Sequence, residues 1–168
     1  MPIQPILRYP HPVLKRIASR VEVIDGDICS LVQDLLDTMV AGPGSVGVAA
    51  PQIGASLRVC VVDVSTSRHG RDNNHGRLCM INPEITARSG AAVMREGCMS
   101  VPDYTGDVER ATTITVTFTE PDGTTRSITA SGFEAVAIQH EMDHLDGILF
   151  LDRIVCITTG LFRRKNYA

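Results

Sequence analysis

The stretch that decides the fold of this protein is Gln139-His140-Glu141-Met142-Asp143-His144-Leu145-Asp146-Gly147. It ends a segment, from about residue 132 to residue 145, in which apolar residues occupy more than one helical face: Phe133, Val136, Ala137, Ile138, Met142 and Leu145. A helix with apolar side chains on most of its sides is a buried helix. The segment therefore predicts a buried helix that Asp146-Gly147 ends and around which the rest of the chain packs.

The spacing of His140 and His144 within this helix points to a metal ion. Residues i and i+4 share one helix face, so both imidazoles can reach the same ion. Glu141, next to the first histidine, can reach a metal-bound water as a base without being a ligand. The alternative is a pair of core histidines with satisfied hydrogen bonds. It is the weaker reading, because unpaired imidazoles on a buried face are costly to desolvate and a metal ion removes that cost.

The other histidines and the cysteines are candidates for a third ligand. Two histidines lie in the polar segment 65–77, an expected exposed loop, and one lies in a turn-like stretch where a surface or structural role is expected: His69, His75 and His11. Four cysteines are interpreted as small buried apolar residues from their apolar or strand-like surroundings: Cys29, Cys60, Cys79 and Cys156. The fifth, Cys98, lies in the Gly-containing segment 96–100, which taken alone fits a buried structural thiol equally well.

The rest of the sequence predicts one more long helix and several strands. Apolar residues between Ile28 and Val40 recur at helical spacing, with Asp27 as the N-cap and Gly42-Pro43 as the stop. Extended runs are expected at about 57–64, 78–85, 112–119, 124–130 and, as a final strand, 148–151. Helices and strands do not alternate regularly. The predicted fold class is therefore α+β, with mostly antiparallel sheets packed around a central buried helix that carries the HExxH motif.

One further segment, Ser45-Val46-Gly47-Val48-Ala49-Ala50-Pro51-Gln52, is rich in small residues. Small side chains let another backbone approach closely, and a glutamine brings both a donor and an acceptor, which suits the lining of a pocket. Taken alone, the segment is better explained as a plain loop.

Composition excludes several classes of protein. The 168 residues are 43% hydrophobic and 21% charged, which is typical of one globular domain spanning residues 1–168. Sixteen Lys and Arg against nineteen Asp and Glu give a net charge of -3, so sequence-specific nucleic acid binding is not expected. We expect no membrane span and no secretion signal. Five cysteines without a CxxC pair argue against a disulfide framework and favour a reducing cytoplasm.

Three segments, taken in order, resemble the motifs of the peptide deformylase family. That family has GxGxAAPQ, EGCxS and QHExDHxxG, which here read Ser45 to Gln52, Glu96 to Ser100 and Gln139 to Gly147. The resemblance extends to Ile6-Leu7, Pro12-Val13-Leu14, Ile81-Asn82-Pro83 and the run 147–153, so it covers nearly the whole chain. The third motif is long and specific. The resemblance implies an α+β fold with antiparallel sheets around a buried metal-binding helix.

The resemblance also implies an activity, namely metal-dependent hydrolysis that removes the formyl group from the N-terminal formyl-methionine of newly synthesised polypeptides and releases formate. Metal-activated water attacks the formyl carbon while Glu141 acts as general acid and base. By position, the metal ligands are Cys98, His140 and His144; the formyl oxygen is held by Gln52 and the backbone amide of Met99. Substrate contacts are expected at Gly47 and Val46, and the methionine pocket is expected to be lined by Val46, Val136 and Ala137. Gln139 and Glu96 are expected to orient the ligands or their neighbours.

A Cys-plus-two-His site suits Zn²⁺, Fe²⁺, Ni²⁺ or Co²⁺, and the resemblance favours one Fe²⁺ per chain as the native ion. Two positions depart from the usual family pattern: Ser45 replaces a glycine and Met99 replaces a leucine. Neither change removes a catalytic group. The basic ending Arg163-Arg164-Lys165 is interpreted as a solvated tail rather than as a transient contact with ribosomal RNA.

Two rival functions remain to be separated. A zinc endopeptidase also uses HExxH, but such proteases usually take their third ligand downstream, where only 24 residues follow His144. A binding protein that keeps the metal and has lost turnover is the second rival. Nothing in the sequence supports the second, since Glu141, Gln52 and three ligands are all present.

Overall fold

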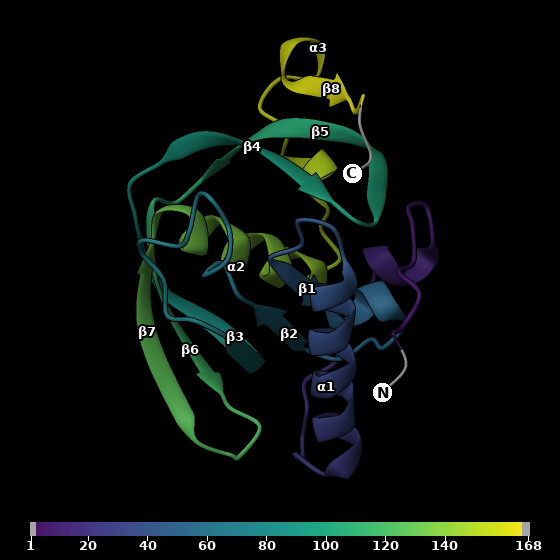
Figure 1. Ribbon diagram of the computed structural model, residues 1–168, viewed down its shortest axis with the longest axis vertical. Coiled ribbons are helices and arrows are strands. Elements are labelled where there is room, and N and C mark those ends of the chain that lie inside the picture. The colour runs from purple at the N-terminus through teal and green to yellow at the C-terminus, as the bar shows by residue number, and fades with distance from the viewer. Residues whose placement is uncertain (1–2, 166–168) are drawn as a thin grey trace.

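The computed structural model describes residues 3–165, so residues 1, 2 and 166–168 of the predicted domain lie outside the described residues. Two antiparallel sheets lie on either side of helix α2 (Gly132–Leu145), as Figure 1 shows. A second long helix, α1 (Gly26–Ala41), packs beside the larger sheet. The fold is α+β, as predicted, and its central helix carries the HExxH motif. None of the helices in residues 3–165 is long and apolar enough to cross a membrane.

The larger sheet has five strands in the order β1-β2-β3-β6-β7. These strands are β1 (Gly47–Ala49), β2 (Val59–Val62), β3 (Leu78–Ser89), β6 (Thr113–Thr119) and β7 (Thr125–Ser131). All neighbouring pairs are antiparallel. The alternating pattern of β6 buries Ile114, Val116 and Phe118 in the core shared with α2, as the sequence predicts.

The smaller sheet has three strands in the order β4-β5-β8, namely β4 (Ala92–Cys98), β5 (Val101–Arg110) and β8 (Leu161–Arg163). Near the end of β4, Glu96 and Cys98 are buried, whereas Arg95 and Gly97 are on the exposed face. Strands β1 and β4 are each at the edge of their sheet. The two edges border the same cavity, which is described below.

Helix α2 is buried on both sides, because each sheet covers one of them. On the side of the larger sheet, Ala135, Ile138 and Leu145 are fully buried in the main core. On the other side, the His140 ring stacks on Phe150, with ring centroids 6.3 Å apart. Burying each large apolar side chain contributes about 1.5–3 kcal/mol, and Ile138 and Leu145 of α2 are buried in this way in the main core. The prediction that this helix is buried is confirmed.

Helix α1 begins earlier than the sequence suggests. Its N-cap is Asp25, whose side chain accepts a hydrogen bond of 3.0 Å from the Ile28 amide, so the prediction of Asp27 as cap is wrong. Asp25 has the extended backbone that a cap requires, and this leaves Asp27 inside the first turn. The helix ends before Gly42, as predicted.

The prediction of a final strand over 148–151 is also wrong. The segment leads into a short 3₁₀ helix, η3 (Phe150–Arg153), in which the Asp152 carboxylate accepts a hydrogen bond of 2.9 Å from the Leu149 amide. Leu149 and Phe150 pack with Val108 of β5. An apolar run of four residues buries its side chains equally well as strand or as turn, and the local hydrogen bond to Asp152 favours the turn. The last strand is instead β8, which follows the short helix α3 (Ile157–Gly160).

Two of the cysteines predicted to be buried are exposed. Cys60 is buried in β2 and Cys79 is half-buried in β3, but Cys29 and Cys156 are exposed. Cys29 lies on the solvent side of α1, whereas its apolar neighbours in sequence point toward the core. His11 has the predicted structural role, since its Nδ1 accepts a hydrogen bond of 3.2 Å from the Val13 amide at the start of η1 (Pro12–Lys15).

Replacing Gly147 by alanine is expected to destabilise the fold by more than about 2 kcal/mol. Gly147 follows α2 with a φ of +71°, and a Cβ there would lie 2.7 Å from the carbonyl carbon and oxygen of Lys15. The measurement is the free energy of unfolding in urea. Gly123→Ala is the control. Gly123 has a φ of +90°, but a Cβ added there would meet no atom of another part of the chain within 4 Å. Its backbone strain alone is expected to cost about 1 kcal/mol. Equal losses in both variants would contradict the role of the Lys15 contact.

Candidate metal centre and its pocket

Cys98, His140 and His144 come together between the smaller sheet and α2. Cys98 ends β4, and the two histidines are one turn apart on α2. Their ligand atoms all lie within 4.8 Å of one another, and the Cys98 Sγ is 3.4 Å from the His144 Nε2. All three side chains are buried. The third ligand candidate that the sequence left open is therefore Cys98, because His11, His69 and His75 do not belong to this group.

The chemistry of these three donors fits a divalent transition metal. Burial alone would raise the pKa of the Cys98 thiol, but His144 and His140 outweigh it and hold that pKa well below its usual value. The thiolate is the form of cysteine that binds metals. One thiolate and two imidazoles are donors that suit zinc, iron, nickel and cobalt, and three protein ligands leave one position open for a reactant.

Glu96 fixes the orientation of His140. Its Oε1 lies 2.8 Å from the His140 Nδ1, so the Nε2 of that ring is the nitrogen left to face a metal ion. The same carboxylate accepts two hydrogen bonds of 2.9 Å from Arg110. Burial would raise the pKa of Glu96, but the hydrogen bonds from Arg110 and His140 lower it to about 2. Glu96 thus carries a full negative charge directly behind His140, and its predicted role in orienting a metal ligand stays a prediction.

Arg110 and Asp143 extend this network, and the sequence analysis identified neither. The Arg110 Nη1 lies 2.6 Å from the Asp143 Oδ2, and Arg153 binds the same carboxylate through Nε and Nη2 at 2.5 and 3.0 Å. Arg110 is only 5% exposed, so it is a buried cation between two buried anions. The signal in the sequence was Asp143 itself, because a carboxylate on a buried helix requires a cation nearby.

Gln139 contacts backbone rather than a ligand. Its amide nitrogen donates to the carbonyls of Ala111 and Ala135 at 2.9 Å, and its Oε1 accepts from the Ala111 amide at 3.1 Å. These bonds attach α2 to the segment between β5 and β6. Gln139 therefore fixes the helix that carries the histidines, and its predicted influence on the ligands stays a prediction.

Glu141 is buried at the floor of the cavity, beside Gly47 of β1. A Cβ at Gly47 would lie 2.8 Å from the Cγ and Oε1 of Glu141, so the absence of a side chain there makes room for the carboxylate. Burial raises the pKa of Glu141 to about 6, although charges on His140 and His144 act in the opposite direction. Its Oε2 has no hydrogen-bond partner among residues 3–165. A buried carboxylate with a raised pKa and an unused oxygen is suited to exchanging a proton with a reactant.

Gln52 and Met99 lie close to Cys98. Gln52 is in the short helix η2 (Ala50–Ile53), where its Oε1 accepts a hydrogen bond of 3.0 Å from the Ala49 amide. This bond turns the Nε2 toward Ser100 Oγ, at 3.1 Å, and toward Cys98 Sγ, at 3.5 Å. Met99 is in the turn between β4 and β5. Both residues line the same cavity as Glu141 and His140.

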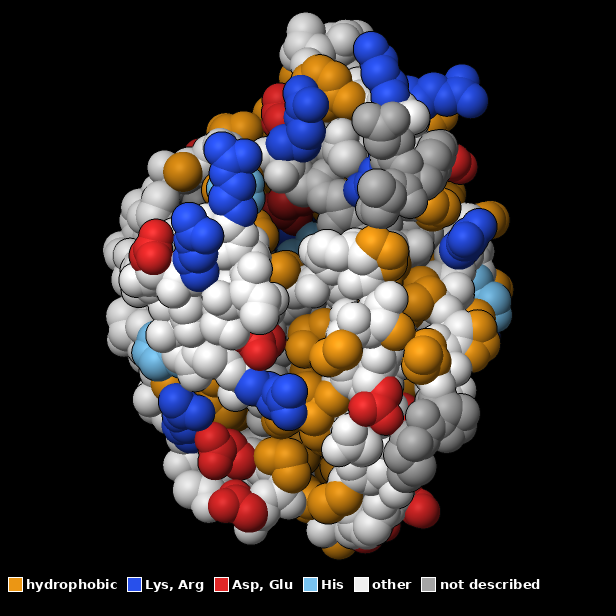
Figure 2. Space-filling model, in the orientation of Figure 1, with side chains coloured by type: hydrophobic (Ala, Val, Ile, Leu, Met, Phe, Trp, Pro, Cys, Tyr) orange, Lys and Arg blue, Asp and Glu red, His pale blue; other side chains and the backbone are white. Residues whose placement is uncertain are grey.

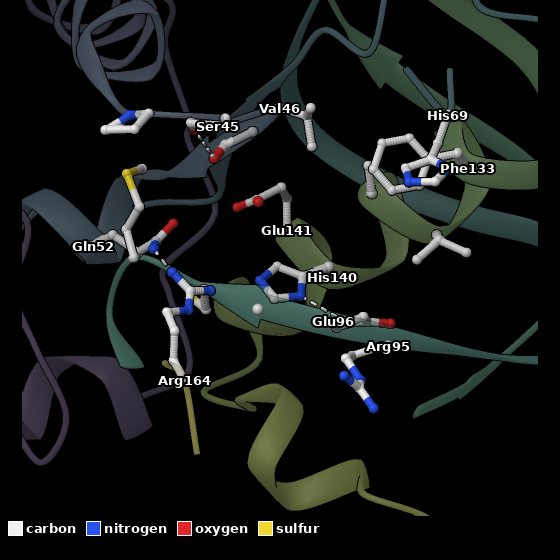
Figure 3. Close-up of a pocket in the computed structure, with 18 residues that line it drawn as sticks. Ser45, Val46, Gln52, His69, Arg95, Glu96, Phe133, His140, Glu141 and Arg164 are labelled. Atoms are coloured by element: carbon white, nitrogen blue, oxygen red, sulfur yellow. Dashed lines mark hydrogen bonds and ion pairs between the residues drawn. The ribbon is translucent and has the colours of Figure 1, made fainter. Parts of the chain in front are cut away.

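The cavity has a volume of about 320 Å³ and opens to solvent. Figure 2 shows a hollow beneath β5 and β8, with an acidic side chain and a histidine at its floor and Lys or Arg side chains at its rim. Its apolar wall includes Val46, Phe133, Val136 and Ala137, three of which the sequence analysis proposed for the methionine pocket. Figure 3 shows Glu141 pointing into this space between Val46 and His140.

Among the ionisable residues that line the cavity, three were not predicted there: His69, Arg95 and Arg164. The segment 65–77 is largely exposed, as expected, but it also borders the cavity. The His69 ring is 5.6 Å from the Phe133 ring, and His75 donates from its backbone amide to buried Glu134 at 2.6 Å. Arg163 and Lys165 are exposed, as expected, but Arg164 is half-buried and lines the cavity, so the interpretation of this segment as a solvated tail is wrong for Arg164. Hydrogen-bonded pairing of β8 with β5 brings this segment back to the cavity.

Comparisons with known proteins agree with this site. The family model described as polypeptide deformylase matches residues 3–159. A peptide deformylase of Syntrophobacter fumaroxidans is 43% identical over 98% of this chain and 94% of that protein. The Synechococcus elongatus peptide deformylase, solved in complex with actinonin, superposes with a TM-score of 0.84 at 32% identity, covering 94% of this chain and 82% of that one.

A peptide deformylase from Acinetobacter baumannii, solved with Met-Ala-Ser bound, gives a TM-score of 0.82 at 35% identity, over 91% of this chain and 99% of the other. The family model spans most of the chain, and the sequence relative spans nearly all of it. These proteins are enzymes, and the structural likeness covers more than 90% of this chain. The chain therefore belongs to the polypeptide deformylase family.

Proposed function

We propose that this protein removes the formyl group from the N-terminal formyl-methionine of newly synthesised polypeptides. The observation that carries the proposal is the buried group of Cys98, His140 and His144, which opens into a cavity shared with Glu141 and Gln52. Family membership supports the same activity. The Acinetobacter baumannii relative binds Met-Ala-Ser, a peptide of the kind that deformylation would release. Residues 1–168 are proposed to act as a single catalytic domain.

Cys98, His140 and His144 would hold one divalent metal ion. When bound, such an ion supplies a Lewis acid that polarises the formyl group and makes hydroxide available near neutral pH. Iron is the proposed native ion, with zinc, nickel or cobalt as possible occupants, since the donor set suits all four. Glu96 holds the His140 ring in position from behind. A transient contact with the ribosome and a cytoplasmic location stay predictions from the sequence.

Glu141 is proposed to move the proton of the reaction. As a carboxylate it accepts a proton from the attacking water, and as a carboxylic acid it gives that proton to the leaving amine. A pKa of about 6, raised by burial, lets both forms exist near neutral pH. The Oε2, which has no protein partner in residues 3–165, is the atom available for this exchange.

Gln52 and the backbone amide of Met99 are proposed to hold the formyl oxygen as negative charge develops on it. The Gln52 Oε1 is already bound to the Ala49 amide, so its Nε2 is kept in the donor position. Donors that are held in place before the reaction stabilise a developing oxyanion without reorganising. Gly47 would contact the peptide through its backbone, and the methionine side chain would occupy the apolar wall near Val46.

The endopeptidase alternative is less well supported. The third donor is Cys98, which comes 42 positions before His140 and lies on a different element, rather than a downstream histidine or glutamate. The second alternative, a binding protein without turnover, keeps the same site and is separated from an enzyme by whether the metal-loaded wild type releases formate.

Cys98→Ala is expected to lower the metal content from about one ion per chain to a small fraction of that, because two imidazoles alone bind weakly. Elemental analysis of the purified protein measures the change. Cys79→Ala is the control, since Cys79 is a half-buried strand residue outside the ligand group. An unchanged metal content in Cys98→Ala would remove Cys98 from the ligand set.

Glu141→Gln is expected to slow formate release from formyl-Met-Ala-Ser by about 10²- to 10⁴-fold, because the amide cannot transfer the proton. The metal content should stay near that of the wild type. Glu84→Gln, on the exposed side of β3, is the matched control and should leave the rate unchanged. Deformylation at the wild-type rate by Glu141→Gln would rule out this mechanism.

Arg110→Met is expected to destabilise the protein by about 3–5 kcal/mol, because it leaves Glu96 and Asp143 as buried anions without their shared cation. Arg126→Met removes a more exposed ion pair with Glu120, at 3.2 Å, and should cost less than about 1 kcal/mol. Urea unfolding of both variants gives the comparison. Similar losses would show that the buried network does not stabilise the fold more than a surface pair.

A further inference from the structure

Two arginines border the cavity although neither belongs to the metal centre. Arg164 follows β8, and Arg95 is on β4, three residues before Cys98. In Figure 3 the Arg164 side chain extends toward Gln52, whereas Arg95 lies on the other side of His140. The cavity therefore has a cationic side chain on each side of its histidine.

The backbone holds Arg164 in this position. Its amide donates a hydrogen bond of 2.8 Å to the Asp103 carbonyl, which continues the pairing of β8 with β5. Its guanidinium lies over Gly97, where the Cβ of any other residue would overlap it. Because residue 97 has no side chain, the Arg164 side chain has room to lie over β4 at this position and reach the cavity.

Arg95 is held on the same face of the sheet. Its Cζ lies 3.6 Å from the centre of the Phe162 ring, and its Nε is 3.9 Å from Asp107. Residues 95 and 97 share one face of β4, as residues 162 and 164 share one face of the segment at β8. The two guanidinium groups therefore lie on one face of the smaller sheet, near its β4 edge.

In the part of the chain that the structure describes, no acidic side chain pairs with Arg164. Glu96, the nearest acidic residue in sequence to Gly97, is already bound to Arg110 and His140. A half-buried guanidinium presents several donors in one plane and binds carboxylates through two hydrogen bonds. Its natural complement is an anionic group on the substrate.

The position of these arginines matches the part of a peptide that follows formyl-methionine. A strand rises about 3.3 Å per residue. Along β4, the distance from the metal centre therefore increases from Cys98 to Gly97 and then to Arg95. β4 is at the edge of its sheet, and an extended peptide beside it would pass Arg164 and Arg95 within two or three residues.

We propose that Arg164, with Arg95, determines substrate preference by binding a carboxylate in the two residues after formyl-methionine. This inference rests on the proposed deformylase activity. The carboxylate has two possible sources, an acidic side chain or the C-terminus of a short peptide, and both present the same chemistry to a guanidinium.

Four peptides separate these sources: formyl-Met-Ala-Glu-amide, formyl-Met-Ala-Gln-amide, formyl-Met-Ala-Ser and formyl-Met-Ala-Ser-amide. For each, kcat/KM for formate release is measured with the metal-loaded wild type and with Arg164→Ala, Arg164→Lys, Arg95→Ala and Arg163→Ala. Arg163 is the matched control, because it is the exposed neighbour on the opposite face of β8. The readout is a ratio of two substrates, so a general loss of activity cancels.

The wild type is expected to prefer the Glu peptide over the Gln peptide by about five- to tenfold, mainly through KM. Arg164→Ala should bring this ratio close to one, Arg164→Lys should keep part of it, and Arg95→Ala should lower it by a smaller factor. Arg163→Ala should leave it unchanged. If only the ratio of formyl-Met-Ala-Ser to its amide falls in Arg164→Ala, the bound group is the peptide C-terminus.

Equal ratios in the wild type and Arg164→Ala for both pairs would overturn the inference. That result is distinct from failure of the proposed function, in which the metal-loaded wild type would release no formate from any of the four peptides.

Discussion

The carboxylate of Glu96 is the group on which the rest of the site depends. It accepts two hydrogen bonds from Arg110 on β5 and lies 2.8 Å from the His140 Nδ1 on α2, so one buried anion joins the smaller sheet to the central helix. Its charge is stable in the interior only while both partners are present. Cys98 is two residues further along β4, so the strand that carries Glu96 also brings the thiolate to the two imidazoles. Folding of β4 against α2 therefore also brings the three candidate ligands together.

Much of the architecture and part of the site could be predicted, because the signals are local. The buried helix follows from apolar residues on opposite faces, and the pair β6–β7 follows from alternation around the turn at Pro121-Asp122-Gly123. The i, i+4 spacing of His140 and His144 is a property of any helix. By contrast, the choice of Cys98 as the third donor needed the likeness to a family, since residues alone fitted a structural thiol equally well. The structure then brings the three donors together.

The features that escaped the sequence analysis depend on contacts between distant residues. Arg110 stabilises Asp143 across 33 positions, and no local pattern connects the two. The strands β4 and β5 interrupt their apolar residues with charged residues and glycine, so they lack the regular alternation that marks β6. Arg164 was placed in solvent because a run of basic residues is usually solvated, whereas pairing of Leu161–Arg163 with β5 returns it to the cavity. The shift of the α1 cap from Asp27 to Asp25 is a choice between two good caps two residues apart.

The position of β1 and β4 at the edges of their sheets has a consequence for self-association. An uncovered strand edge can pair with another copy of the chain and so begin aggregation. Here the edges border a common cavity, and the exposed face of β4 carries Arg95. Pairing of two such edges would bring the Arg95 side chains of two copies together, and like charges disfavour that contact. A single extended chain can still enter. The arrangement proposed to take a peptide as an added strand would therefore also hinder pairing between copies of the chain.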